Sequence, residues 1–455
     1  MWLFYSGNDK PGIPLIIINI LQIKIYNFTR FFKHLNKMSG RRWPEGIQYF
    51  GVEDFKYDLP QDRIAQYPLR DRDKSKLLIY KNGDISETIF SNIHKEIEPN
   101  STMVYNNSRV IKARLYFEKQ TGSRIEVFCL EPVLPPDFEA AMAAKGITEW
   151  RCIIGNLKKW KQGKIKCHFR SEGFDHIVWA EKLYPSEDDN TWTVRFTWDS
   201  GDFTFKEFIE SAGHVPLPPY INRPDEPFDK IRYQTVYSRK EGSVAAPTGG
   251  LHFTDEVLEK LKSKGIRQLN ITLHVSAGTF RPVKVNNILE HEMHSELFFV
   301  DREFIIDLMK RKGPVLSVGT TSLRALESLY WAGIKVRMNP EADPFSFQID
   351  QWEPYKIKVK LKPEESLEIL LEWMDKKNLN KFSGSTKLFI FPGYKFMFPD
   401  ILLTNFHLPG STLLMLVAAW TGSDWKKIYQ YALENNFRFL SYGDASLLFR
   451  KDVIF

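Results

Sequence analysis

The most regular alternation of hydrophobic and polar residues lies in the first half of the chain. Apolar and polar residues alternate strictly from Trp192 to Trp198, with the period of two that is typical of a half-buried β-strand. Short apolar segments between turn-forming residues predict further strands at 123–131, 150–156, 163–169 and 176–183. Short strands in such close succession indicate a small antiparallel β-barrel or sandwich. We therefore expect an inserted β domain, a barrel or a sandwich, over residues 109–213.

The rest of the chain alternates between helix and strand patterns. Thr204 and Glu207 form a capping box for the helix that ends the β segment. Predicted strands lie at 267–275, 314–321, 387–393 and 400–410, and predicted helices at 255–264, 322–333, 411–422 and 425–436. Alternation of this kind indicates a sheet covered by helices. We expect an α/β main domain made of residues 49–108 and 214–455, in which residues 331–385 form an irregular surface excursion.

Residues 1–48 do not share this organisation. They contain an apolar run, Gly12–Ile23, that is too short to span a bilayer, for which about 20 residues are needed. A single preceding lysine and the lack of a small-residue cleavage site argue against a signal peptide. Met38 offers an alternative start, and a protein that begins there should be as stable and active as the full chain. We expect residues 1–48 to be a poorly ordered extension.

The net charge of +7 is concentrated in the same segment, because residues 1–48 contain seven lysines and arginines against two acidic residues. A nucleic-acid site in the body must therefore be a local basic patch. The candidates are Lys158, Lys159, Lys161 and Lys164, for which an ordinary solvated hairpin tip is the alternative. Three cysteines without paired spacing argue against a disulfide framework and indicate a reducing, cytoplasmic location.

Small and polar residues follow several of the predicted strands. The segment EGSVAAPTGGLHFT, 241–254, combines tiny residues with a proline and a histidine, and similar corners occur at 273–283, 317–324 and 404–412. Ligands of α/β proteins bind at the carboxyl ends of the strands, so we expect these corners to converge on one site. The alternative is that they are tight strand-to-helix turns without a ligand.

Other catalytic motifs are incomplete. The segment VGTTS lacks the ending of a Walker A loop, and no G-x-S-x-G nucleophile elbow occurs in the sequence. HEMHSE, 291–296, is one residue short of the zinc-protease motif. His291 and His294 could share one helical face, but no third ligand stands at a suitable spacing. We therefore expect no metal.

Blocks of sequence from about residue 51 to the C-terminus resemble one enzyme family. They include YNNSRVIKARL (105–115), YSRKEGSVAAPTGGLHFT (237–254), MHSE (293–296), VGTTSLRALES (318–328) and TNFHLPGSTLLMLV (404–417). In these blocks the chain resembles the S-adenosylmethionine:tRNA ribosyltransferase-isomerases of queuosine synthesis. The resemblance implies an α/β domain with a small β-barrel, the same fold class that the hydrophobic pattern predicts.

The resemblance also implies a reaction and its partners. The enzyme would transfer the ribosyl part of S-adenosylmethionine to 7-aminomethyl-7-deazaguanine at the wobble position of a tRNA and isomerise it, which gives epoxyqueuosine, adenine and methionine. S-adenosylmethionine is then a co-substrate, and no cofactor or metal is needed. We expect a monomer that acts in the cytoplasm without binding a membrane.

The chemistry of that reaction suggests which residues take part. The sulfonium acidifies the ribose 5′ carbon, so a base is needed there, and adenine leaves more easily when an acid protonates it. The catalytic candidates are His252, His294, His407 and Glu296. The candidates for substrate binding are Asn107, Arg109, Thr248, Gly249, Gly250, His274, Gly278, Thr279, Arg281, Thr320, Thr321, Arg324 and Asn405. We expect His252 to face His294 and Glu296, with the two glycines before it letting the backbone approach the substrate.

Some positions depart from the family pattern. Ser276 stands where the family shows glycine, and Lys387 stands where it shows aspartate. Two alternatives follow: an RNA-binding homologue without catalytic activity, and a transferase that acts on another acceptor. The first would not need the polar residues that follow the strands, and these residues are present.

Overall fold

The structure, a computed structural model, describes residues 50–171, 173–186, 191–199, 203–275, 283, 285–344 and 346–450. All of them belong to one compact unit. The extension expected over residues 1–48 lies outside the described residues. In the part of the chain that is described, no helix is both long and apolar enough to cross a lipid bilayer.

The main sheet has ten strands, and its centre is parallel. In spatial order the strands are β15 (Gln348–Ile349), β16 (Lys381–Thr386), β13 (Glu296–Asp301), β12 (Arg267–Leu273), β3 (Thr102–Asn106), β14 (Val315–Val318), β17 (Ile401–Asn405), β18 (Ala445–Phe449), β1 (Lys76–Lys81) and β2 (Asp84–Ile89). The strands β12, β3, β14 and β17 run parallel, so they end at one edge, which we call the carboxyl edge. Because β13 is antiparallel to β12, and β18 and β1 run opposite to β17, these three strands begin at that edge.

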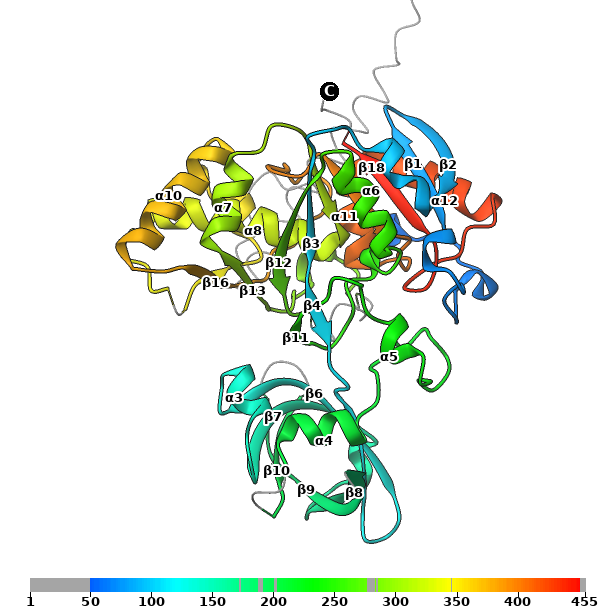
Figure 1. Cartoon of the computed structure of the whole chain (residues 1–455), viewed down its shortest axis with the longest axis vertical. Helices are drawn as coiled ribbons and strands as arrows, with labels where there is room; N and C mark the ends of the chain where they lie inside the picture. Colours follow the sequence, from blue (N-terminus) through cyan, green and yellow to red (C-terminus); the bar gives the residue numbers. More distant parts are fainter. Residues whose placement is uncertain are drawn as a thin grey trace, which may run out of the picture. The chain divides into compact units, whose positions relative to one another are not determined.

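Helices cover this sheet (Figure 1). The helices outside the barrel are α2 (Ile93–Glu96), α5 (Asp229–Arg232), α6 (Asp255–Ser263), α7 (Arg302–Met309), α8 (Gly319–Met338), α9 (Glu353–Lys356), α10 (Pro363–Lys376), α11 (Thr412–Thr421) and α12 (Trp425–Glu434), of which α5 does not lie on the sheet. The long helix α8 contacts β3, β12, β14 and β17, and α7 and α10 pack against the same hydrophobic cluster. Almost every residue of α8 is buried, so its amino end is held firmly at the carboxyl edge.

The inserted β segment is a closed antiparallel barrel, with α3 (Phe138–Met142) and α4 (Phe205–Ala212) packed on it. Its strands are β5 (Arg114–Glu118), β6 (Arg124–Leu134), β7 (Ile147–Gly155), β8 (Ile165–Ser171), β9 (Phe174–Pro185) and β10 (Trp192–Thr197). Val194, Phe196 and Trp198 are buried in its core, as the alternation predicts. The three cysteines are free and buried in β6, β7 and β8. The predicted fold class, an α/β domain with an inserted antiparallel barrel, is confirmed.

Outside the barrel, a short parallel pair, β4 (Ser108–Val110) and β11 (Lys240–Ser243), lies next to the chain's two crossings between barrel and sheet. The capping box predicted for the last barrel helix is present, because the Thr204 hydroxyl accepts from the backbone N–H of Glu207 and the Glu207 carboxylate accepts from the backbone N–H of Thr204.

Two expectations about the second half of the chain are wrong. Residues 331–385 are not a surface excursion, because α10 and β16 lie in this segment and Phe347, Ile349 and Trp373 are buried in the core. The strand expected at 387–393 is also absent, since β16 ends at Thr386 and the next residues form no ladder. Leu388 to Phe391 are apolar because they cross the buried carboxyl edge, where neighbours cover them on all sides.

Candidate active site

Two cavities lie at the carboxyl edge of the sheet. Cavity 1, of about 30 Å³, lies at the start of β13 and after β14, β16 and β17, where its lining includes His291, His294, Glu296, Arg324 and Thr412. Cavity 2, of about 20 Å³, lies before β1 and β18, where its lining includes Arg72, Arg232, His252, Arg438, Ser441 and Tyr442. Spaces of this size admit a few atoms of a ligand rather than a whole nucleoside.

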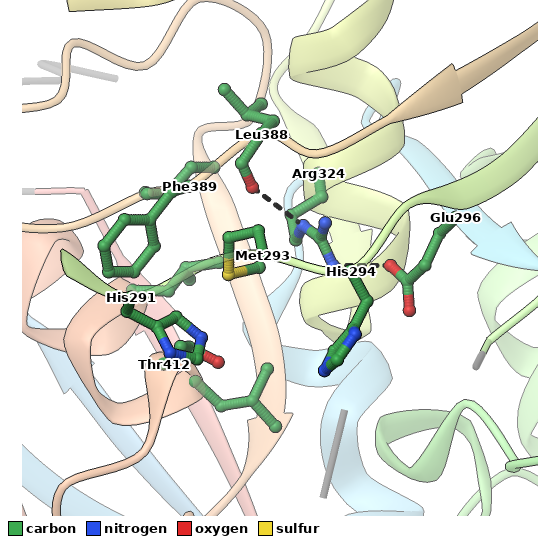
Figure 2. A pocket seen from close by; sticks show the side chains of 11 residues that line it. His291, Met293, His294, Glu296, Arg324, Leu388, Phe389 and Thr412 are labelled. Atoms are coloured by element: carbon green, nitrogen blue, oxygen red, sulfur yellow. Dashed lines mark hydrogen bonds and ion pairs between the residues drawn. The ribbon is translucent and has the colours of Figure 1, made fainter. Parts of the chain in front are cut away.

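A buried ion pair forms one wall of cavity 1 (Figure 2). The Arg324 Nη1 atom lies 2.5 Å from Oε2 of Glu296, and the two side chains are 7% and 2% exposed. Arg324 also donates from Nε to the carbonyl of Leu388, at 3.2 Å. Its third nitrogen, Nη2, is buried and has no partner. A buried donor of this kind is costly unless it meets an acceptor, so Arg324 is equipped to hold an oxygen of a ligand.

Two histidines complete the polar lining of cavity 1. Figure 2 shows the His291 ring beside Thr412, and the His294 ring below the ion pair. Burial, and then the neighbouring His294, lower the pKa of His291 to about 4, so this imidazole is neutral near pH 7. Gln351 fixes the segment, because it accepts from the backbone N–H of Met293 at 3.0 Å and donates to the carbonyl of His291 at 2.6 Å.

The HEMHSE segment is not helical, so the helical face considered for His291 and His294 does not form. Residues 291–295 instead lead into β13, which begins at Glu296. Within the described ranges, no group of three or more histidines, cysteines or acidic residues is arranged to hold a metal ion.

The start of α8 provides further polar groups about one helical turn before Arg324, although only Arg324 of this helix lines cavity 1. Gly319 has a φ of +85°, which lets the chain turn from β14 into the helix. Thr320 and Thr321 are buried in the first turn, and the hydroxyls of Thr321 and Ser322 have no partner. Free backbone N–H groups at a helix start favour negative charge, and unpaired hydroxyls beside them add donors.

The space beside Gly249 and Gly250, the two glycines before His252, is occupied by other parts of the protein and is not open to a ligand. A Cβ on Gly249 would lie 3.1 Å from the Cα of Gly319, and a Cβ on Gly250 would lie 2.0 Å from the hydroxyl of Tyr237. Thr248 is half-buried in the same 3-10 turn. The small residues therefore allow the backbone to pack on the start of α8, which differs from the expected approach to a substrate.

The expectation that His252 faces His294 is wrong, because His252 lines cavity 2 and His294 lines cavity 1. Its Nδ1 is 2.8 Å from the Ser75 hydroxyl, and its Nε2 is 3.3 Å from the Asn405 amide nitrogen, which also donates to the carbonyl of Leu440. Because that amide nitrogen is a donor, Nε2 accepts and Nδ1 carries the proton. Burial, and then the charge of Arg438, lower the pKa of His252 to about 3, so its ring is neutral at pH 7.

The candidates His407, His274 and Asn107 line neither cavity. His407 and Asn107 form side-chain hydrogen bonds within the fold, whereas Nδ1 of His274 is buried without a hydrogen-bond partner. His407 contacts the Thr404 hydroxyl through Nε2 at 2.9 Å, and burial lowers its pKa to about 3. His274 stacks on Phe138 with the ring centroids 6.0 Å apart, and burial, then Lys381, lower its pKa to about 4.

The Asn107 side chain donates from Nδ2 to Oδ1 of Asn270, at 2.8 Å, and accepts at Oδ1 from the Thr272 hydroxyl, at 2.7 Å. Arg109 is exposed on β4. Gly278, Thr279 and Arg281 lie outside the described residues, as does Ser276.

The structure thus brings together His294, Glu296 and Arg324 in cavity 1, close to the start of α8. Sequence reasoning missed the contribution of His291, Thr412 and Gln351, and all the arginines of cavity 2. The HEMHSE segment could have indicated His291 as a site residue. Gln351 lies in segment 331–385, which the sequence predicts to be a surface excursion, so nothing in the sequence indicated it. Arg72 and Arg438 precede strands and Arg232 ends a helix, so a search for residues that follow strands does not find these arginines.

Comparisons with known proteins show the family to which the chain belongs. The family model described as "Queuosine biosynthesis protein" matches residues 52–448. The S-adenosylmethionine:tRNA ribosyltransferase-isomerase of Halothermothrix orenii is 41% identical over 406 residues, which cover 87% of this chain and 99% of that protein. The crystal structure of the S-adenosylmethionine tRNA ribosyltransferase of Thermotoga maritima is 28% identical, covers 87% of this chain and 99% of its own, and gives a TM-score of 0.41. The chain belongs to the queuosine biosynthesis protein family.

Proposed function

We propose that this protein is an S-adenosylmethionine:tRNA ribosyltransferase-isomerase. It transfers the ribosyl moiety of S-adenosylmethionine to 7-aminomethyl-7-deazaguanine at the wobble position of a tRNA and isomerises it, releasing adenine and methionine. The observation that carries this proposal is the 41% identity to a protein of that name over 99% of that protein's length. The groups gathered in cavity 1 are of the types that the reaction needs.

His294 is the residue proposed to remove the proton from the ribose 5′ carbon, which the adjacent sulfonium makes acidic. A histidine can accept a proton near neutral pH, and His294 and Glu296 line the same cavity. The departing adenine takes up a proton, the aminomethyl nitrogen attacks the sugar, and methionine leaves with the electrons of its bond to the 5′ carbon. A water-poor cavity favours these steps because it keeps water from the reactive intermediate.

Glu296 and Arg324 are proposed to position the substrate rather than to transfer protons. The carboxylate balances the buried guanidinium charge, which would otherwise be costly. The unpartnered Nη2 of Arg324 is then free to donate to an oxygen of S-adenosylmethionine. Thr320, Thr321 and the start of α8 would bind the hydroxyls of the sugar.

S-adenosylmethionine serves in this proposal as a co-substrate, without a metal or another cofactor. We also propose that the protein acts as a monomer in the cytoplasm, where its three buried cysteines stay reduced. Size-exclusion chromatography with light scattering tests the first of these points, and turnover in the presence of a chelator tests the need for a metal.

The reaction itself is tested by incubation with S-adenosylmethionine and a tRNA that carries 7-aminomethyl-7-deazaguanine. Adenine release and the mass of the modified nucleoside are the measurements, with unmodified tRNA and the free base as comparison substrates. His294→Ala should reduce turnover by ~10²–10⁴ and leave S-adenosylmethionine binding almost unchanged, because proton transfer occurs in the transition state. The matched control is His168→Ala, an exposed histidine of the barrel strand β8. Absence of adenine release with every acceptor would refute the proposal.

A further inference from the structure

Cavity 2 gathers guanidinium groups from three separate stretches of the chain. Arg72 precedes β1, Arg232 ends α5, and Arg438 precedes β18, and all three line the same cavity. Arg72 donates to the backbone carbonyls of Gln234 and Ile231, at 2.9 and 3.3 Å. These bonds fix the guanidinium in place, but they provide no negative charge.

Arg232 is held in the same way. It donates to the carbonyls of Leu69 and Arg70, at 2.6 and 2.8 Å, and its Nε is buried without a partner. Among the described residues, no ion pair involves Arg72 or Arg232. Arg438 does have a carboxylate neighbour, Asp444, at 3.4 Å.

The charges at cavity 2 therefore do not balance. Burial, and then the like charge of Arg232, lower the pKa of Arg72, whereas the carboxylate of Asp255, which does not line the cavity, acts in the opposite direction. The positive charges of Arg438 and Arg72 also contribute to the lowered pKa of His252. A bound anion would relieve the repulsion between Arg72 and Arg232 and would meet the free Nε donor.

The size and the rim of the cavity indicate which kind of anion fits. A space of about 20 Å³ admits one or two non-hydrogen atoms, so it fits a projecting oxyanion and not a nucleobase. Beside it stands Tyr67, which is 52% exposed and whose carbonyl accepts from Arg438 at 3.4 Å. The Arg223 guanidinium lies 4.3 Å from the Tyr67 ring centroid. Exposed aromatic rings beside arginines suit single-stranded RNA, which offers bases for stacking and phosphates for pairing.

We infer that cavity 2 binds a backbone phosphate of the RNA substrate, with Arg72 and Arg232 as the groups that pair with its oxygens. The inference rests on the proposed function for the identity of the RNA. It assigns cavity 1 to the chemistry and cavity 2 to holding the RNA backbone at the same edge of the sheet.

The test introduces a carboxylate that competes for the same arginines. Leu69 lines the cavity and its carbonyl accepts from Arg232, so Leu69→Glu places an internal anion beside the cavity. Leu69→Gln is the matched control, with the same shape and no charge. Binding of tRNA carrying 7-aminomethyl-7-deazaguanine is measured without S-adenosylmethionine at several salt concentrations.

We expect the Glu variant to bind RNA at least about tenfold more weakly than the Gln variant. The slope of log K against log salt should become shallower by about 0.7 for one lost phosphate contact with a single strand. The melting temperature of the Glu variant should not fall below that of the Gln variant, because the added carboxylate offsets the repulsion. Arg337→Gln, an exposed arginine near the far end of α8, removes a charge remote from the cavity and should leave the slope unchanged.

Two results would overturn the inference. One is equal RNA affinity and equal salt slope in the Glu and Gln variants. The other is unchanged RNA binding with a raised KM for S-adenosylmethionine, which would assign cavity 2 to the methionine carboxylate. If the melting temperature of the Glu variant falls below that of the Gln variant, RNA affinity and salt slope are measured for Arg232→Lys, which retains the positive charge. Because RNA binding is measured without turnover, a wild-type protein that binds RNA but releases no adenine would contradict the proposed function and leave this inference standing.

Discussion

The ion pair between Glu296 and Arg324 allows structure and catalysis to be separated by experiment. Glu296→Gln keeps the shape of the side chain and removes its charge, which leaves the Arg324 guanidinium buried without a counter-ion. Breaking a buried pair by removing one partner costs about 3–5 kcal/mol. Native domains are stable by only about 5–15 kcal/mol, so the single variant should lose a large part of its stability. Arg324→Met should be similarly destabilised, because it removes the guanidinium that balances the buried Glu296 carboxylate.

The double variant, Glu296→Gln with Arg324→Met, removes both charges. Its loss of stability should be at least about 2 kcal/mol smaller than the two single losses combined, because both buried charges are removed together. Urea unfolding, followed by fluorescence and circular dichroism, measures the free energy of unfolding for all four proteins. The exposed pair of Arg302 and Asp375, with Nε and Oδ1 2.7 Å apart, is the control. Asp375→Asn should change stability little, since solvent screens that pair.

Adenine release in the same four proteins decides the functional part of the argument. If Arg324 positions the co-substrate through Nη2, the double variant should be folded but should turn over no faster than the single variants. The reasoning would be refuted if the single losses of stability simply add in the double variant. Near-normal adenine release by a folded double variant would show that the pair has a structural role only.

Three further predictions test other parts of the molecule. Gly250→Ala should destabilise the fold by about 1–3 kcal/mol, because the new Cβ would clash with the Tyr237 hydroxyl. Adding Tyr237→Phe removes that buried, unpartnered hydroxyl, so the double variant should recover part of the loss in thermal unfolding. The pKa values of His252 and His407 are about 3 in the folded protein and about 6.5 when unfolded. Stability should therefore fall as the pH drops below about 6.5, by up to about 2 kcal/mol for each histidine at pH 5, and urea unfolding of His407→Gln at pH 7 and pH 5 should show a smaller pH dependence than wild type. Reversing the charges of four exposed barrel lysines should weaken tRNA binding and make the slope of log K against log salt shallower. An unchanged slope would mean that the RNA binds elsewhere. The four residues are Lys158, Lys159, Lys161 and Lys164.

Local patterns in the sequence determined many of the elements and indicated the edge of the sheet where the two cavities lie. The alternation from Trp192 to Trp198 indicates a strand because burial on one face imposes a period of two, and β10 shows it. The capping residue Thr204 reports a helix start through bonds that span only three residues. The small and polar corners could be placed at one edge because the carboxyl ends of parallel strands meet there. Each of these signals depends on neighbours within a few positions in the chain.

The division of that edge into two cavities depended on contacts between distant residues. Gly249 meets Gly319 across 70 positions of sequence, and this contact lays the turn before His252 on the start of α8. His252 accordingly faces Asn405 and the arginines rather than His294. The hydrophobic pattern could not show this, because the same small residues are compatible with a ligand or with a second backbone. Segment 331–385 was misread for a related reason: its buried residues are scattered, and they form a core only where α8 and β16 bring them together. The sequence by itself determined the family, the strands of the barrel and the helices α6, α8, α11 and α12, whereas the order of the strands decided which charged groups meet.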